Sequence, residues 1–303
     1  MSGHYTHLPD GSHIRIIMGT LKNFASLVKI SHTVFALPFA VIGFAMGVEA
    51  FPDGFYWWLL LKVVACMFFA RTAAMAFNRY ADRDIDALNP RTASREIPAG
   101  VVLPRSALIL TVVCSLLFVA TAATINTLVF ALSPVALLVV LGYSYTKRFT
   151  ALCHLVLGLG LGVAPTAAYI SVTGRFAAEP VLLSLLVIMW CGGFDIIYAL
   201  QDERFDRDHG LHSIPAAIGA KNALALSSLM HLCVAAMVVM IGELYLPTAM
   251  YAAGAVIFVA LLVYQHLIVK HDDLSRVGLA FGTTNGVASL VYALFTVLAI
   301  VFR

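Results

Sequence analysis

Long apolar stretches alternate along the chain with shorter polar connectors. Nine of these stretches are predicted to be helices, at 31–50, 56–79, 106–125, 128–145, 153–173, 181–201, 222–242, 248–269 and 280–302. A helix needs roughly 20 apolar residues to cross a hydrocarbon core of about 30 Å. The apolar residues do not alternate with a period of two, which argues against a membrane β-barrel. We therefore expect an all-α polytopic membrane protein with nine transmembrane helices, because only internally paired backbones span a bilayer.

The composition agrees with a chain surrounded by lipid. Of its 303 residues, 61% are hydrophobic and 12% are charged, about half the charged share of a soluble domain. The five cysteines all lie in apolar stretches and show no CxxC spacing, which is typical of buried packing residues. We expect a polar N-terminal segment over 1–26 and one transmembrane domain over 27–303. The expected surroundings are a lipid bilayer and no nucleic acid, and the oligomeric state is left open.

The basic residues predict the orientation of the chain. Fifteen of the nineteen Lys and Arg residues lie in the N-terminal segment or at the connectors after the second, fourth, sixth and eighth stretches. Connectors rich in Lys and Arg stay on the cytoplasmic side of a membrane. We therefore expect a cytoplasmic N-terminus and an external C-terminus.

Two acidic motifs close the second and sixth apolar stretches. In the first, Asn78, Asp82 and Asp86 follow one another at intervals of four residues, which places them on one face of a helix. The second motif is a similar stripe made of Asp195, Tyr198, Asp202 and Asp206. Asp202 follows Asp82 by 120 residues, as Asp206 follows Asp86, which indicates a weak internal repeat. Both motifs leave the membrane on the same side and are expected to face each other.

Carboxylates gathered in this way repel one another unless a cation neutralises them. Mg²⁺ typically takes one or two protein carboxylates together with phosphate oxygens, so we expect a site for a Mg²⁺-bound diphosphate. The alternative is that the acids are ordinary solvated helix caps. We expect them instead in the last turn of each helix, where the macrodipole disfavours anions. Asp84, Glu203 and Asp208 lie off the stripes and are better explained as surface charges.

Basic residues suited to phosphate accompany both motifs. Arg91 and Arg95 follow the first motif, and Lys147 and Arg148 stand at the end of the fourth stretch. Arginine binds phosphate through two parallel hydrogen bonds and lysine acts as a point charge. Some of these cations also serve as ordinary positive-inside anchors.

Arg71 lies inside the second apolar stretch, seven residues before Asn78 and about 10 Å deeper on the same face. An arginine at this depth needs an anionic partner. The two candidates are Asp195 and the carboxylate of a bound substrate. Lys29, near the start of the first stretch, is a second candidate for binding an anionic substrate, although snorkelling to the interface explains it almost as well.

These motifs together resemble the UbiA family of intramembrane aromatic prenyltransferases over roughly residues 20–300. The family patterns and their matches, in chain order, are Asn-x-x-x-Asp-x-x-x-Asp (Asn78, Asp82, Asp86), Arg-Thr-x-x-Arg-x-x-Pro-x-Gly (Arg91, Thr92, Arg95, Pro98, Gly100), Tyr-Ser-x-x-Lys-Arg (Tyr143, Ser144, Lys147, Arg148) and Tyr-Ala-x-x-Asp-x-x-x-Asp (Tyr198, Ala199, Asp202, Asp206). Many members carry Asp at the position of Arg79. In Arg79, in Asn89-Pro90-Arg91 and in the run 29–40, the chain resembles a bacterial branch that is implicated in menaquinone synthesis by the futalosine route.

The resemblance implies Mg²⁺-dependent transfer of a polyprenyl group from polyprenyl diphosphate to an aromatic acid, either 4-hydroxybenzoate or a dihydroxynaphthoate-type acid, in ubiquinone or menaquinone biosynthesis. It also implies a bacterial inner membrane and a site that faces the cytoplasm. The implied metal ligands are Asn78, Asp82, Asp86, Asp202 and Asp206, with Lys147 as a further catalytic group. The implied substrate contacts are Arg71, Lys29, Arg91, Arg95, Arg148, Tyr198 and Asp195.

Three other functions would account for part of this pattern. Another UbiA-type lipid or isoprenoid transferase would share the same site chemistry. A CDP-alcohol phosphotransferase needs an Asp-Gly-x-x-Ala-Arg signature that neither motif provides. A cation-coupled membrane transporter would place its acids near the middle of the membrane, often at broken helices, whereas here they gather at one face beside phosphate-suited loops.

Overall fold

The computed structural model describes residues 26–27 and 35–303, and this part of the chain is helical apart from connectors and one isolated bridge between Lys270 and Asp273. The long helices are α2 (Leu37–Ala50), α3 (Trp57–Ala81), α5 (Pro104–Ala123), α6 (Thr127–Thr146), α7 (Cys153–Thr173), α8 (Ala178–Ala199), α11 (Ala220–Leu244), α12 (Ala249–Ile268) and α13 (Asn285–Val301). Short elements join them: η2 (Pro52–Gly54), α4 (Arg83–Leu88), η3 (Leu200–Asp202), α9 (Glu203–Asp208), α10 (Ile214–Ile218) and the π-helix η4 (Leu279–Thr284).

The predicted all-α membrane fold is confirmed. Eight helices in the described part of the chain are long and apolar enough to cross a membrane. Their ends lie within three residues of the predicted ones, except that α13 begins at Asn285, five residues after the predicted start, because the π-helix η4 precedes it. The remaining predicted span, 31–50, corresponds to α2, which is apolar but has only 14 residues. The predicted start of that span, at residue 31, lies outside the described residues.

The helix ends follow from local sequence. The side chains of Asn126 and Thr248 accept hydrogen bonds from the backbone N–H groups of Val129 and Tyr251, so they cap α6 and α12. Such caps satisfy amides that have no partner within the helix. Gly174 ends α7 in the left-handed conformation, at φ 67°, which glycine adopts without a steric penalty.

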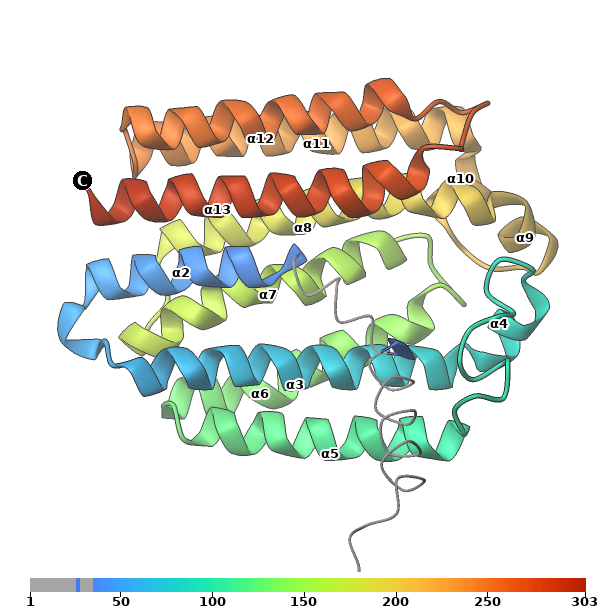
Figure 1. The fold of residues 1–303 in the computed structure, drawn as a ribbon, viewed down its shortest axis with the longest axis horizontal. Helices are drawn as coiled ribbons and strands as arrows, with labels where there is room; N and C mark the ends of the chain where they lie inside the picture. The colour runs from blue at the N-terminus through green and yellow to red at the C-terminus, as the bar shows by residue number, and fades with distance from the viewer. Residues whose placement is uncertain (1–25, 28–34) are drawn as a thin grey trace, which may run out of the picture.

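The long helices run side by side, and the short elements α4, α9 and α10 gather at one end of the bundle (Figure 1). The helices α2, α7 and α8 lie in the middle, with α3, α5 and α6 on one side and α11, α12 and α13 on the other (Figure 1). The C-terminus lies at the end opposite α4 and α9 (Figure 1). Both acidic motifs therefore emerge at the same end, as the sequence predicted.

Glycines allow the central helices to approach closely. A Cβ atom at Gly43 of α2 would lie 2.0 Å from the carbonyl oxygen of Pro165 in α7. A Cβ atom at Gly158 of α7 would lie 2.4 Å from the carbonyl oxygen of Ile188 in α8, and Gly162 is similarly crowded by α8. Small residues four apart permit such contacts in membranes, where dispersion contacts between close backbones replace the hydrophobic effect. The central layer is therefore rigidly packed.

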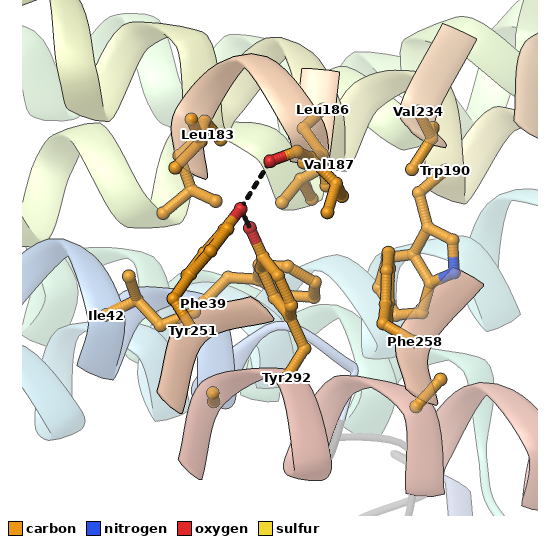
Figure 2. Packing of buried hydrophobic residues seen from close by; sticks show 14 of the residues in the cluster. Phe39, Ile42, Leu183, Leu186, Val187, Trp190, Val234, Tyr251, Phe258 and Tyr292 are labelled. Atoms are coloured by element: carbon orange, nitrogen blue, oxygen red, sulfur yellow. Dashed lines mark hydrogen bonds between the residues drawn. The ribbon is translucent and has the colours of Figure 1, made fainter. Parts of the chain in front are cut away.

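An aromatic and aliphatic core joins α2 and α8 to the C-terminal helices (Figure 2). Trp190 of α8 packs against Phe39 of α2 at 5.0 Å between ring centroids and against Phe258 of α12 at 5.9 Å. The hydroxyl groups of Tyr251 and Tyr292 lie 2.8 Å apart, and Tyr251 donates to the Val238 carbonyl at 2.7 Å (Figure 2). Both tyrosine hydroxyls thus have a hydrogen-bond partner, which offsets the cost of burying them.

The π-helix η4 precedes α13 and places an aromatic ring beside the second motif. Asn285 donates from Nδ2 to the Ala280 carbonyl at 2.9 Å, and it accepts from Trp190 Nε1 at 3.1 Å. The ring of Phe281, within η4, lies on the ring of Tyr198 at 4.2 Å. A buried amide therefore holds the irregular turn that positions Phe281.

The close approach of α2 and α7 gives a test of the packing. We expect Gly43→Ala to destabilise the protein by about 1–3 kcal/mol, because the added methyl group overlaps the Pro165 backbone. Gly142→Ala in α6 is the control, since a Cβ there meets no atom within 4 Å. The readout is the thermal unfolding midpoint in detergent, and equal midpoints for the two variants would contradict the described packing.

Candidate active site

The first acidic motif spans a break between two helices. Helix α3 ends at Ala81, and Asp82, at φ −94° and ψ 4°, begins the short helix α4 that carries Asp86. The amide of Asn78 donates from Nδ2 to Asp82 Oδ2 at 2.8 Å. The motif residues therefore stay in contact across the break.

The second motif repeats this geometry. Helix α8 ends at Ala199, the turn η3 follows, and Asp202, at φ −105° and ψ 1°, begins α9, which carries Asp206. Two motifs 120 residues apart thus share one local fold, which agrees with the internal repeat in the sequence.

The expectation that the acids occupy the last turn of a long helix is wrong. Asp86 and Asp206 lie in the first turns of α4 and α9, because the backbone at Asp82 and Asp202 leaves the helical region and starts a new helix. First-turn acids are common caps. Neither Asp82 nor Asp202, however, accepts a capping hydrogen bond through its side chain. Their carboxylates are directed to other partners.

The loop after the first motif reaches across to the second. Arg91 donates from Nε to Asp202 Oδ1 at 2.9 Å and from Nη2 to Oδ2 at 2.5 Å. Its Nη1 donates to the Tyr198 hydroxyl at 3.0 Å, and Asn89 Nδ2 donates to Asp202 Oδ1 at 2.9 Å. These contacts bring the two motifs together in one site.

The other three acids are paired as well. Arg95 contacts both oxygens of Asp86, the nearer at 2.7 Å. The other two cations, Lys147 and Arg148, come directly after the end of α6. Lys147 Nζ lies 2.7 Å from Asp206 Oδ1, and Arg148 Nη2 lies 3.3 Å from Asp82 Oδ1. Four acids of the two motifs therefore each meet one cation predicted from the sequence: Asp82, Asp86, Asp202 and Asp206.

The compensation of these acids is incomplete. Asp206 is fully buried, and although Lys147 is close, the angle is not that of a hydrogen bond, so neither carboxylate oxygen of Asp206 has a hydrogen-bond partner among the described residues. Burial raises the pKa of the Asp82 carboxyl, and the charge of Asp86 adds to this effect, whereas Arg148 opposes it. Buried carboxylates that lack full compensation fit a site for an additional cation.

No group of three or more His, Cys, Asp or Glu side chains among the described residues is arranged to hold a metal ion. The acids instead stand in separate pairs with cations. This arrangement does not make an all-protein metal cage, and it suits a magnesium ion that draws part of its coordination from phosphate oxygens.

The suggested pair between Arg71 and Asp195 is not formed. Asp195 Oδ2 instead lies 2.7 Å from His154 Nδ1 of α7. Arg71 is largely buried on α3, and its Nε has no hydrogen-bond partner among the described residues. A substrate anion remains as its candidate partner. Lys29 lies outside the described residues.

Three polar residues at or near the site received no role from the sequence. Arg79 is 4% exposed, with an Nε that has no hydrogen-bond partner among the described residues, and it adds a positive charge near Asp86. Asn89 binds Asp202, and His154 binds Asp195. A histidine within an apolar span was a usable signal, because ionisable groups there are rare and usually functional. Asn89 carried no comparable signal.

Comparisons with known proteins give a consistent result. Residues 36–287 match the model of the UbiA prenyltransferase family. The chain is 30% identical over 250 residues to a 4-hydroxybenzoate octaprenyltransferase of Aliivibrio fischeri (strain MJ11), covering 82% of this chain and 85% of that protein. The apo structure of a UbiA homolog from Aeropyrum pernix K1 matches with 33% identity and a TM-score of 0.77, over 90% of this chain and 98% of that one.

A second solved structure shares the fold. The UbiA homolog from Archaeoglobus fulgidus, solved bound to DMAPP and Mg²⁺, is 18% identical, with a TM-score of 0.74 over 93% of this chain and 100% of that one. At this identity the likeness concerns the helical arrangement alone.

The buried pair of Lys147 and Asp206 can be tested by stability. We expect Lys147→Met to lower the unfolding free energy by about 3 kcal/mol, because it leaves the Asp206 carboxylate buried without a counter-charge. Adding Asp206→Asn to that variant should restore most of the loss. In the control, Arg204→Met removes an exposed pair with Asp208 and should change stability by less than about 1 kcal/mol. Equal losses for Lys147→Met and Arg204→Met in thermal unfolding would refute the inference.

Proposed function

The chain belongs to the UbiA prenyltransferase family and is an aromatic prenyltransferase, and on this premise we propose that it transfers a polyprenyl group from polyprenyl diphosphate to an aromatic acid in respiratory quinone biosynthesis. The observation that carries the proposal is the contact of Arg91 and Asn89, from the loop of the first motif, with Asp202 of the second. It joins two acidic motifs and their cations into a single site at one end of an apolar bundle.

The proposed metal is Mg²⁺. Its proposed ligands come from both motifs and are Asn78, Asp82, Asp86, Asp202 and Asp206. The fit rests on the buried carboxylate of Asp206, which lacks hydrogen bonds among the described residues, and on the raised pKa of Asp82. When bound, the ion supplies Lewis-acid stabilisation of the charge that develops on the departing diphosphate. The magnesium-bound relative from Archaeoglobus fulgidus supports the choice of metal.

The basic residues around the acids bind the diphosphate in this proposal. Arg91, Arg95, Lys147 and Arg148 now neutralise the carboxylates, and each can turn to a phosphate oxygen once a metal compensates its acid. Arg91 already presents two nitrogens, Nε and Nη2, to the two oxygens of Asp202, a geometry that phosphate also accepts. Arg95 contacts both oxygens of Asp86 through Nη1. The same cations thus pair with the acids in this structure and bind phosphate in a site that holds metal and diphosphate.

The acceptor lies deeper in the bundle in this proposal. Arg71 binds the carboxylate of the aromatic acid, which supplies the partner that its buried guanidinium lacks among the described residues. Tyr198, held by Arg91 and covered by Phe281, forms a wall between this carboxylate and the diphosphate. Lys29 stays a second candidate for an anionic substrate, on sequence grounds alone. The surrounding apolar helices exclude water from the allylic cation.

The names of the curated relatives favour 4-hydroxybenzoate as the acceptor and an octaprenyl donor. A dihydroxynaphthoate-type acid is the second candidate. It is kept because Arg79 stands where many members of the family carry Asp. In the structure Arg79 places a buried positive charge near Asp86. The bacterial relatives favour a bacterial inner membrane, and the distribution of basic residues favours a site at the cytoplasmic face.

Metal removal and single-atom substitutions test the chemistry. We expect EDTA to abolish transfer of a labelled polyprenyl group and Mg²⁺ to restore it. Asp82→Asn and Asp202→Asn should each lower kcat by about 100-fold or more. Each substitution removes a charged oxygen that would bind the metal, and the metal stabilises the departing diphosphate by several kcal/mol. Asp208→Asn is the matched control, since this exposed acid lies outside the site. Transfer that persists without metal, or at full rate in both variants, rules out the mechanism.

The role of Arg71 has a separate readout. We expect Arg71→Gln to raise KM for the aromatic acid by about tenfold or more, the loss of one hydrogen bond to a charged group, and to leave KM for polyprenyl diphosphate unchanged. Lys62→Gln, in the half of α3 away from the motif, should change neither constant. An Arg71→Gln variant that raises KM for the diphosphate instead would place this arginine on the donor.

A further inference from the structure

A buried pair, His154 and Asp195, stands beside the site and takes no part in the compensation of the acidic motifs. His154 begins α7, has a side chain that is 3% exposed, and holds Asp195 Oδ2 at 2.7 Å. Asp195 lies on the same stripe of α8 as Tyr198, one turn deeper than that residue. Ionisable side chains at this depth in an apolar span are rare and usually functional, so we expect this pair to have a function.

The backbone determines which nitrogen of His154 carries the proton. The N–H of Ile214, at the start of α10, donates to His154 Nε2 at 3.2 Å. Because Nε2 accepts this bond, the proton of the neutral imidazole is on Nδ1, which donates to Asp195. His154 is thereby fixed in one tautomer and orients the Asp195 carboxylate.

One oxygen of Asp195 remains available. Oδ2 is used by His154, whereas Oδ1 has no hydrogen-bond partner among the described residues, and the side chain is 16% exposed. Tyr198, three residues further along the same face of α8, accepts a hydrogen bond from Arg91 Nη1 of the site at 3.0 Å. Asp195 therefore belongs to the region between the helices of the site, and its free oxygen is an acceptor without a donor.

The depth of Asp195 matches the position of an acceptor ring. The offset of 120 residues makes Asn78 and Tyr198 equivalent. Arg71 is seven residues before Asn78 and Asp195 is three before Tyr198, so Asp195 lies about 6 Å nearer the diphosphate end than Arg71. An aromatic acid whose carboxylate binds Arg71 would present its ring carbons at the level of Asp195.

We propose that Asp195, oriented by His154, accepts the proton that the aromatic ring loses as the new carbon–carbon bond forms. This inference rests on the proposed function. The allylic carbon–oxygen bond breaks and its electron pair leaves with the diphosphate, and a π pair of the ring forms the new bond to the allylic carbon. The electrons of the ring C–H bond then restore aromaticity while the proton passes to Asp195 Oδ1. No oxidant or reductant is needed. Asp195 is the catalytic residue, and His154 is a positioning residue.

The ring proton gives a direct test. The acceptor is 4-hydroxybenzoate with deuterium at the carbons beside the hydroxyl-bearing carbon, assayed with polyprenyl diphosphate and Mg²⁺. We expect no isotope effect in the natural enzyme, where ionisation of the donor limits the rate. Asp195→Asn should lower kcat by about 100-fold, the contribution of a positioned base, and should reveal a primary isotope effect, because proton loss becomes slow.

The positioning role of His154 is tested with two substitutions. His154→Leu removes the donor to Asp195 and should lower kcat by about tenfold, as expected for one hydrogen bond to a charged group, with an isotope effect. His154→Gln keeps an N–H donor and should recover most of the rate. His271→Gln, at an exposed histidine of the connector after α12, is the control for the substitution itself.

The isotope effect is a ratio within one variant, so a smaller amount of folded protein leaves it unchanged. An Asp195→Asn variant that transfers the prenyl group without an isotope effect overturns the proposal and assigns the proton to another acceptor, such as the diphosphate. Loss of prenyl diphosphate cleavage in the same variant also overturns it, because Asp195 would then serve the donor. If the natural enzyme transfers no prenyl group to any aromatic acid, the proposed function itself fails.

Discussion

The site depends on one electrostatic constraint: four carboxylates at the end of an apolar bundle must each be compensated locally. An unpaired charge in such surroundings costs several kcal/mol. The pairs of Arg91, Arg95, Lys147 and Arg148 with the acids meet most of this requirement without a ligand. The Asp206 carboxylate still accepts no hydrogen bond among the described residues. Because Arg91 comes from the loop of one motif and pairs with the other, compensation also ties the two halves of the site together.

The apolar bundle supplies rigid packing and an apolar interior next to these charges. Helices α2, α7 and α8 approach through glycines that leave no space for a side chain, so the centre is rigid. An aromatic core continues from this layer into α12 and α13. The allylic cation of the proposed reaction needs a site from which water is excluded, and a closely packed apolar interior lies next to the charged end. The chemistry and the packing therefore meet at the ends of α3 and α8.

Hydropathy and length predicted the spans closely, because the thickness of a bilayer dictates both. The residues of the site were also predictable, since acids and arginines at apolar helix ends are costly enough to stand out. The pairing of particular acids with particular cations was not, because it depends on how the loop from Asn89 to Arg95 crosses the bundle. The same limit explains the incorrect pairing of Arg71 with Asp195: His154 lies 41 residues from Asp195 in sequence and competes for it. The helix breaks at Asp82 and Asp202 could not be predicted, because no proline or glycine stands at either position.

The π-helix before α13 connects residues far from the acids to the charged end of the bundle, so substitutions there would affect the site. Its irregular turn is held by Asn285, whose own partners lie on α8, α12 and η4. Phe281, inside the turn, rests on Tyr198, which contacts Arg91. A change of one amide in the C-terminal third of the chain would thus reach the charged end through two stacked rings. Natural variants that differ at this amide are expected to differ in catalysis while every acid and cation of the two motifs stays the same.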